Sequence, residues 1–260
     1  SDWSSDVCSS DLSLITEAKK HGGEVVVSIF VNPTQFGPGE DLAAYPRNFD
    51  RDRTLCEESG AAVIFAPDPD TVYGPGFQTY VSLEKLPQHL CGLSRPVHFR
   101  GVATVVTKLF NIVKPHVAVF GQKDYQQLLV IRRLVRDLNF DIEIIGAPIV
   151  RESDGLAMSS RNTYLTPDDR RQALCLSRSL DHAEKRVQEG ETDPEQIRRE
   201  ALDRITAQPN AAVDYVAICD PHTLQPVTAP DRLDKPVLMA LAVKFGKTRL
   251  IDNRVLDPHR

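Results

Sequence analysis

Short apolar runs alternate with helix-like segments through the first 150 residues, and this alternation constrains the fold more than any other feature of the chain. The apolar runs predict strands at 24–31, 61–65, 116–120 and 140–145, with a shorter one at 79–83. Between them, apolar residues recur at helical spacing and predict helices at 13–20, 48–59, 102–113 and 126–138. Nearly continuous apolar strands separated by helices are typical of parallel sheets. The pattern therefore predicts an α/β fold, a doubly wound parallel sheet with right-handed connections.

The pattern changes beyond about residue 151. A long polar helix is expected at 168–188 and a second helix at 194–207, followed by strands near 212–219, 237–244 and 248–252. Helices followed by a run of strands are typical of an α+β arrangement. We therefore expect a Rossmann-like domain at 12–150 and a smaller C-terminal α+β domain at 151–260.

Composition excludes several classes of protein. With 41% hydrophobic residues and no apolar run of 18 residues, the chain is expected neither to span a membrane nor to be secreted. The net charge of −5 gives no basic excess for binding nucleic acid. The five cysteines are scattered, without CxxC pairs or metal-ligand spacing, so reduced thiols and no metal site are expected. We expect a cytoplasmic protein.

Polar residues follow the strand 116–120 directly. Gly121, Gln122, Lys123 and Asp124 lie between this strand and the helix that begins near Gln126. Open α/β sheets bind nucleotides at such places, where free backbone N–H groups and the helix dipole attract phosphate and a lysine can add its charge. A surface loop with an ordinary lysine and a capping aspartate is the alternative that this segment alone leaves open.

Two other segments favour a ligand site. Gln35 follows the apolar run 24–31, and the loop after Val150 carries Ser159, Ser160 and Arg161, groups that suit phosphate oxygens. Residues 37–47, which contain glycine, proline, tyrosine and arginine, suit either a lid over a substrate or a plain solvated loop.

Five segments in order resemble the pantothenate synthetase (pantoate–β-alanine ligase) family of the nucleotidylyltransferase-like superfamily. They are Phe-Val-Asn-Pro-Thr-Gln-Phe at 30–36, Asp41 with Tyr-Pro-Arg at 45–47, Arg-Pro at 95–96 with His-Phe-Arg-Gly-Val at 98–102, Gly-Gln-Lys-Asp-Tyr-Gln-Gln at 121–127, and Met-Ser-Ser-Arg-Asn at 158–162. The resemblance runs from about Ser13 to the C-terminus. Val97 departs from the family, which usually has glycine there. His98 is interpreted as a structural residue because it has no partner in sequence.

The resemblance implies an ATP-dependent ligase of coenzyme A biosynthesis. Pantoate and ATP would form pantoyl adenylate and pyrophosphate, and β-alanine would then displace AMP to give pantothenate. Gln35 and Gln127 would bind pantoate, and Gln35 would also contact β-alanine. Lys123 and Arg161 would stabilise the developing charge, as the catalytic residues. The residues implied to bind ATP are Gly121, Gln122, Lys123, Asp124, Val150, Met158, Ser159, Ser160 and Arg161. The resemblance also implies Mg²⁺ as the companion of ATP, a homodimer, and a C-terminal domain that acts as a lid.

The N-terminal segment departs from the family. The family's Met-Gly-x-Leu-His-x-Gly-His motif binds nucleotide phosphates and supplies a proton-donating histidine, but residues 1–11 here are mostly serine and aspartate. We interpret this segment as a foreign-looking leader, non-native or disordered, on an N-terminally truncated chain that lacks the first strand and the histidine loop. The departure predicts impaired or absent catalysis by the chain as written, with exposed strand edges and a gap in the core.

Two alternative functions remain open from the sequence. One is another nucleotidylyltransferase that acts on a different substrate. The other is a catalytically dead homologue that still binds its ligands.

Overall fold

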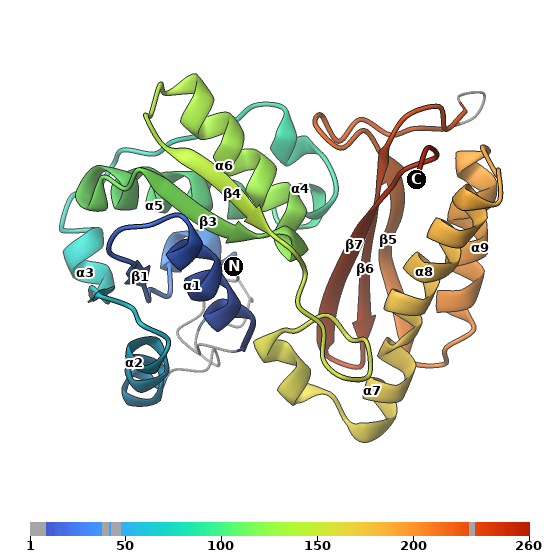
Figure 1. The fold of residues 1–260 in the computed structure, drawn as a ribbon, viewed down its shortest axis with the longest axis horizontal. Helices are drawn as coiled ribbons and strands as arrows, with labels where there is room; N and C mark the ends of the chain where they lie inside the picture. The colour runs from blue at the N-terminus through green and yellow to red at the C-terminus, as the bar shows by residue number, and fades with distance from the viewer. Residues whose placement is uncertain (1–8, 38–41, 43–47, 229–231) are drawn as a thin grey trace. The chain divides into compact units, whose positions relative to one another are not determined.

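The structure is a computed structural model that describes residues 9–37, 42, 48–228 and 232–260 (Figure 1). The chain divides into two compact units, Ser1–Val150 and Arg151–Arg260. Each unit has a hydrophobic core formed by its own residues.

The strands of the first unit are short and parallel. β1 (Val26–Ser28) pairs with β2 (Val63–Phe65), and β3 (Val117–Gly121) pairs with β4 (Glu143–Ala147). The expected α/β fold with parallel strands is confirmed. Among the described residues, the strands form two separate two-stranded ladders rather than one continuous sheet.

The helices of the first unit surround these strands. They are α1 (Ser9–Lys20), η1 (Pro33–Gln35), α2 (Phe49–Glu58), α3 (Pro69–Val72), η2 (Leu86–Gln88), α4 (Cys91–Ser94), α5 (His98–Val113), η3 (Gln122–Asp124) and α6 (Tyr125–Asp137). The main core of the unit packs one face of α5, with Val102 and Val106 fully buried, against Ile131 of α6 and Phe120 of β3. This packing holds the C-terminal end of β3 in a fixed place.

Several predicted boundaries differ from the structure. Helix α1 begins at Ser9 rather than Ser13, so it includes the last three residues of the segment 1–11. The predicted strand at 79–83 is wrong, because the Val81 N–H donates to the side chain of Thr104 on α5 instead of to a neighbouring strand. The strands β1 and β2 are also less buried than their apolar sequences predict, since Val26 is 38% exposed and Val63 is 48% exposed.

The second unit is an antiparallel sheet with helices on one face. The sheet has the order β5 (Ala211–Cys219), β6 (Val237–Phe245), β7 (Thr248–Leu256), and helices α8 (Cys175–Gln188) and α9 (Pro194–Thr206) lie along one face of it (Figure 1). Two shorter helices precede them, η4 (Ser160–Tyr164) and α7 (Pro167–Ala173). The predicted single helix at 168–188 is therefore two helices, separated at Leu174, whose side chain packs against the core of this unit.

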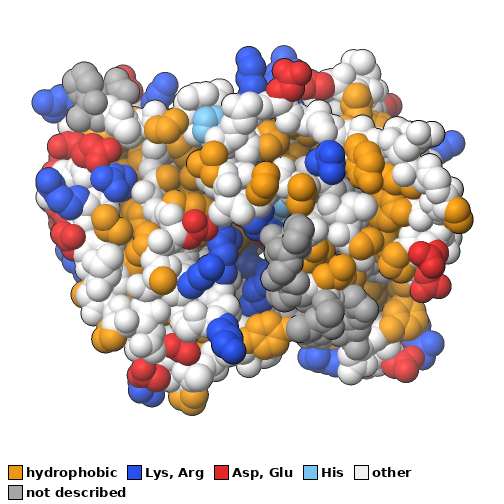
Figure 2. All heavy atoms as spheres, turned by 180° about the vertical axis from the view of Figure 1, so that it is seen from behind, with side chains coloured by type: hydrophobic (Ala, Val, Ile, Leu, Met, Phe, Trp, Pro, Cys, Tyr) orange, Lys and Arg blue, Asp and Glu red, His pale blue; other side chains and the backbone are white. Residues whose placement is uncertain are grey.

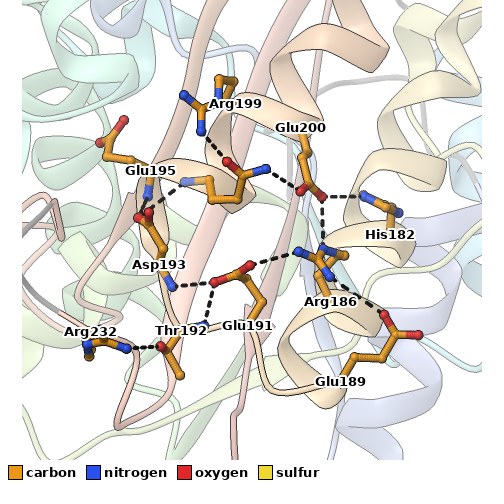
Figure 3. A network of polar contacts seen from close by, with 11 residues as sticks. His182, Arg186, Glu189, Glu191, Thr192, Asp193, Glu195, Arg199, Glu200 and Arg232 are labelled. Carbon is orange, nitrogen blue, oxygen red and sulfur yellow. Dashed lines mark hydrogen bonds and ion pairs between the residues drawn. The ribbon is translucent and has the colours of Figure 1, made fainter.

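A polar network joins α8 to α9 and to the turn between them (Figure 3). The Glu200 carboxylate of α9 contacts His182 Nε2 at 2.7 Å and accepts a hydrogen bond from Arg186 Nε at 3.2 Å, and both partners lie on α8. Arg186 also donates to Glu191 in the turn, and Glu191 in turn accepts from the backbone N–H of Asp193. Asp193 caps the N-terminus of α9. The network fixes the angle at which these two helices meet.

The surface carries side chains of both charges. Figure 2 shows acidic and basic side chains on the displayed face, with hydrophobic side chains among them. Among the described residues, none of the helices is both long enough and apolar enough to cross a membrane.

Candidate active site

Gln35 lies in a buried polar cluster at the end of η1. The residue is 6% exposed, and its Oε1 accepts a hydrogen bond from Asn32 Nδ2 at 3.1 Å. Asn32 is completely buried and caps η1, since its Oδ1 accepts from the backbone N–H of Thr34 at 3.3 Å. The sequence signal for this cap is an asparagine before a proline at the end of an apolar run, a turn pattern.

The orientation of the Asn32 amide follows from its backbone partners. The Thr34 N–H can only donate and the Gly101 carbonyl can only accept, and these groups lie 3.3 Å from Oδ1 and 3.1 Å from Nδ2, respectively. The Tyr73 hydroxyl also donates to Oδ1, at 2.7 Å. Because Nδ2 is the end that faces Gln35, the opposing Gln35 atom must be its carbonyl oxygen. The Gln35 Nε2 group is therefore the end of that amide that can donate to a ligand.

Helix α5 approaches η1 closely at Gly101. A Cβ atom on Gly101 would lie 2.5 Å from the backbone of Thr34 and Gln35, so only glycine allows this approach. His98, one turn earlier, is 8% exposed, and its Nδ1 lies 3.2 Å from the Gln35 carbonyl. Gly101 and His98 therefore both position the backbone of Gln35. Sequence patterns do not reveal the contribution of Tyr73, because 41 residues separate it from Asn32.

Burial raises the pKa of the Tyr73 hydroxyl, while its hydrogen bond with Thr34 acts in the opposite direction. The hydroxyl therefore remains protonated at neutral pH. In that form it is a donor to Asn32, which supports the amide orientation described above.

The segment Gly121–Asp124 forms the junction between β3 and α6. Gly121 ends the strand, η3 covers Gln122–Asp124, and α6 begins at Tyr125. Gln122 Nε2 donates to the Gly146 carbonyl of β4 at 3.1 Å, so this side chain ties the junction to the neighbouring strand. The backbone groups of Gly121–Asp124 thus lie where a helix begins after a parallel strand, which is a typical place for a bound anion.

Two adjacent glutamines on α6 have different surroundings, although both are 6% exposed. The Gln126 amide donates to the backbone carbonyls of Leu86 and His89 and accepts from the backbone N–H of Cys91. It therefore fastens the η2–α4 turn to α6. Gln127 is the glutamine that the sequence predicts as a ligand residue, and it lies on the same helix within the first unit.

The other predicted nucleotide residues are Val150, the last residue of the first unit, and Met158–Arg161 in the second unit. The loop that contains Met158–Arg161 ends in η4, whose N-cap is Ser159, with Oγ accepting from the Arg161 N–H at 3.3 Å. Ser160 is 6% exposed. The structure thus gives Gln35, Gln127 and Gly121–Asp124 in one unit, and Met158–Arg161 as an ordered turn in the other. Of the predicted lid at 37–47, only Gly37 and Leu42 lie within the described residues.

No group of three or more His, Cys, Asp or Glu side chains in the described part of the chain is arranged to hold a metal ion. The four cysteines in that part, Cys56, Cys91, Cys175 and Cys219, are free thiols.

Comparison with known proteins gives consistent matches. The family model described as pantoate-β-alanine ligase matches residues 9–255. The chain is 60% identical over 247 residues to the pantothenate synthetase of Desulfatibacillum aliphaticivorans. The aligned region covers 95% of this chain and 87% of that protein.

Two solved structures are also similar. The crystal structure of pantothenate synthetase from Thermus thermophilus has a TM-score of 0.93 at 44% identity, over 97% of this chain and 91% of that one. The pantoate-β-alanine ligase from Francisella tularensis, complexed with β-γ ATP and β-alanine, has a TM-score of 0.76 at 32% identity, over 96% of this chain and 85% of that one.

Proposed function

The chain belongs to the pantoate–β-alanine ligase family, and from this premise we propose how its residues bind the substrates and assist the reaction. It is a pantothenate-forming ligase that condenses pantoate with β-alanine using ATP. The observation that carries this conclusion is the family match over residues 9–255, together with 60% identity to a relative over 95% of the chain. The sequence resemblance is thereby confirmed.

The reaction takes two steps in this proposal. A pantoate carboxylate oxygen attacks the α-phosphorus of ATP, and the bond to the β-phosphate breaks, which gives pantoyl adenylate and pyrophosphate. The amine of β-alanine then attacks the acyl carbon, the acyl–phosphate bond breaks, and AMP leaves while the amine loses a proton. Both steps depend on positioning and on neutralisation of charge rather than on a protein nucleophile.

Gln35 and Gln127 bind pantoate, and Gln35 also contacts β-alanine. A neutral amide suits this role because it orients a carboxylate without forming an ion pair that would weaken the carboxylate as a nucleophile. The contact from Asn32 supports the proposal, since it directs Gln35 Nε2, a donor, toward the ligand.

Gly121, Gln122, Lys123 and Asp124 bind ATP, and the same role belongs to Val150, Met158, Ser159, Ser160 and Arg161. Lys123 and Arg161 are the catalytic residues that stabilise the charge on the phosphoryl oxygens. Mg²⁺ enters with the ATP phosphates, whose oxygens supply the ligands that this hard cation prefers. The relative from Francisella tularensis was crystallised with a form of ATP and with β-alanine, which supports a site for both compounds.

The 260 residues as written contain no Met-Gly-x-Leu-His-x-Gly-His motif. Removal of one transition-state donor typically costs about 3 to 4 kcal/mol, a rate loss of roughly a hundredfold or more. A polypeptide of these 260 residues alone should therefore form the adenylate slowly, and one that also carries a segment with that motif should form it faster. We also propose that the protein forms a homodimer and that it is located in the cytoplasm. Analytical ultracentrifugation tests the dimer.

The test is AMP formation from ATP, Mg²⁺, pantoate and β-alanine, with each substrate omitted in turn. The chain is assayed both as written and with an N-terminal segment that carries the motif. AMP formation that requires both acids supports the ligase, and Gln35→Leu should reduce it much more than the control Gln78→Leu, because Gln78 is exposed. Absence of AMP from both forms would contradict the assignment of substrates, whereas pantoate binding without AMP would identify a catalytically dead homologue.

A further inference from the structure

The segment that begins the second unit folds back on itself before the predicted ATP loop, Met158–Arg161. Arg151 and Ala157 form an isolated antiparallel bridge, and the Glu152 N–H donates to the Leu156 carbonyl at 2.8 Å. Gly155 has a φ of +96°, a conformation that glycine adopts without strain. Residues 151–157 therefore form a tight hairpin, and the loop leaves directly from its end.

Asn162 connects the far end of the loop to this hairpin. The residue is 6% exposed, and its Nδ2 donates to Glu152 Oε1 at 2.6 Å and to the Ala157 carbonyl at 3.1 Å. The residues just before and just after Met158–Arg161 are thus held together by one amide group. The Asn162 side chain therefore joins the two ends of the Met158–Arg161 loop.

Arg170 on α7 holds the other side of the hairpin. Its Nη2 donates to Glu152 Oε2 at 2.5 Å, and its Nε donates to Asp154 Oδ2 at 2.9 Å. One carboxylate oxygen of Glu152 therefore accepts a hydrogen bond from Asn162, and the other accepts one from Arg170. Bonds of this kind, between a guanidinium and carboxylates, are stronger and more directional than neutral hydrogen bonds.

The hairpin is also anchored to the sheet. Arg151 makes two parallel hydrogen bonds, of 2.7 Å and 2.9 Å, to the Asp252 carboxylate on β7, and Asp252 is only 2% exposed. The start of the hairpin is therefore fixed by the sheet, and its turn is fixed by α7.

We propose that Arg170 is a positioning residue for ATP binding, which holds the Met158–Arg161 loop in its bound shape through Glu152 and Asn162. The proposal rests on the assignment of that loop to ATP. Arg170 does not touch the nucleotide in this proposal. It orders the loop before ATP binds, so the loop loses less conformational entropy on binding. Arg170 therefore lowers the dissociation constant of ATP without a direct contact.

The first experiment compares Arg170→Gln with Arg171→Gln in the full chain. Arg171 is the next residue of the same helix, but its side chain is 71% exposed and it pairs with Asp168 on its own helix. Arg170→Gln should raise the dissociation constant of ATP about tenfold in isothermal titration calorimetry, which corresponds to about 1.4 kcal/mol. It should leave the dissociation constant of pantoate unchanged. Arg171→Gln should change neither constant, and Arg170→Lys should recover part of the loss.

A second experiment does not require nucleotide binding. Hydrogen–deuterium exchange of the ligand-free chain should become faster in residues 152–165 of Arg170→Gln, while β6 exchanges as before. Equal exchange in the two arginine variants would overturn the positioning role.

The outcomes separate this inference from the proposed function. If Arg161→Gln leaves ATP binding unchanged, the assignment of the loop is wrong. If Arg161→Gln weakens ATP binding but Arg170→Gln does not, the loop binds ATP and the positioning role of Arg170 is wrong. A circular dichroism melt of each variant shows whether it folds, and Glu152→Gln replaces Arg170→Gln if the latter does not.

Discussion

At the scale of single residues, the buried Asn32 amide sets what Gln35 offers to a ligand. Asn32 Nδ2 is shared between Gln35 Oε1 and the Gly101 carbonyl, and Oδ1 accepts from Tyr73 and Thr34. A buried network in which every partner is matched holds one orientation, because the alternative leaves donors facing donors.

Asn32→Asp should therefore reverse the Gln35 amide. The new carboxylate has no donor, so Gln35 would turn its Nε2 toward residue 32 and its oxygen toward the proposed pantoate site. We expect the dissociation constant of pantoate to rise at least tenfold, since a buried acceptor would then face the pantoate oxygens. Isothermal titration calorimetry measures the dissociation constant of pantoate, with Asn48→Asp as the control. Asn48 is exposed and caps α2, a role that aspartate also fills. Unchanged pantoate affinity in Asn32→Asp would show that the orientation of Gln35 does not matter.

Thiol reactivity should divide the cysteines by burial. Desolvation raises the pKa of Cys175 and of Cys219 to about 12, and that of Cys56 to about 11. The reactive thiolate is therefore scarce at pH 8, and these three thiols should resist iodoacetamide in the native chain. Among the four cysteines that the structure describes, Cys91 is only partly buried and should react before the other three. Mass spectrometry of digested protein identifies the labelled sites, and labelling of Cys175 or Cys219 as fast as in urea would contradict the fold around them.

At the scale of secondary structure elements, the contact between α5 and η1 positions Gln35. Gly101→Ala would place a methyl group 2.5 Å from the backbone of Thr34 and Gln35, so the two elements must separate. We expect a loss of about 2 kcal/mol in the free energy of unfolding, as for other overpacked sites, together with weaker pantoate binding. Urea denaturation measures the first effect. Gly74→Ala is the matched control, because its nearest atom would be the Asp70 carbonyl oxygen at 3.8 Å, an ordinary contact.

The sequence predicts elements better where periodicity is strong and local. The helical spacing of 126–138 predicts α6 to within one residue at each end, and the capping residue Asn48 marks the start of α2. The predicted strand at 79–83 fails because Thr104, distant in sequence, satisfies the Val81 N–H. The break at Leu174 also has no local signal, since Leu174 keeps helical φ and ψ values and its neighbours favour helix.

The candidate site follows the same rule. Gln35 and Gly121 could be predicted as candidates because each follows an apolar run, and strand ends are where α/β sheets bind ligands. The different surroundings of Gln126 and Gln127 could not be predicted, because the partners of Gln126 come from residues 86–91. Neighbouring positions on a helix face different directions, but the sequence does not say what lies in each direction.

At the scale of the whole molecule, hydrogen bonds to carboxylates connect stability to pH. The pKa of Glu200 is lowered first by the hydrogen bond from Gln196, and burial opposes this, while His182 and Arg186 lower it further. Burial raises the pKa of Asp154, but the Leu156 N–H and Arg170 outweigh it, so the net pKa is lowered. The pKa of Asp169 is lowered by the Thr166 hydroxyl and by Asn210. All three groups lie in the second unit.

These lowered pKa values predict that the chain loses stability in acid. A carboxylate with a lower pKa in the folded state binds fewer protons there than in the unfolded state, so its contribution is complete above its unfolded pKa, about 4. The contribution is lost as the pH falls through the folded pKa. The free energy of unfolding should therefore be nearly flat from pH 7 to 5, as far as these groups are concerned, and should decrease steadily below about pH 4.

Glu200→Gln tests this prediction at its best-connected group. Glu200 accepts from Gln196 at one carboxylate oxygen and from Arg186 at the other, whereas glutamine has a single acceptor oxygen and does not titrate. The variant should therefore start less stable at pH 7 and lose less stability between pH 5 and 3 than the parent chain. Urea denaturation at a series of pH values gives both slopes, and Glu58→Gln is the control, because Glu58 is exposed at the end of α2. Equal acid slopes in the parent chain and in Glu200→Gln would show that the α8–α9 network does not depend on the charge of Glu200, and that the acid sensitivity arises from other carboxylates.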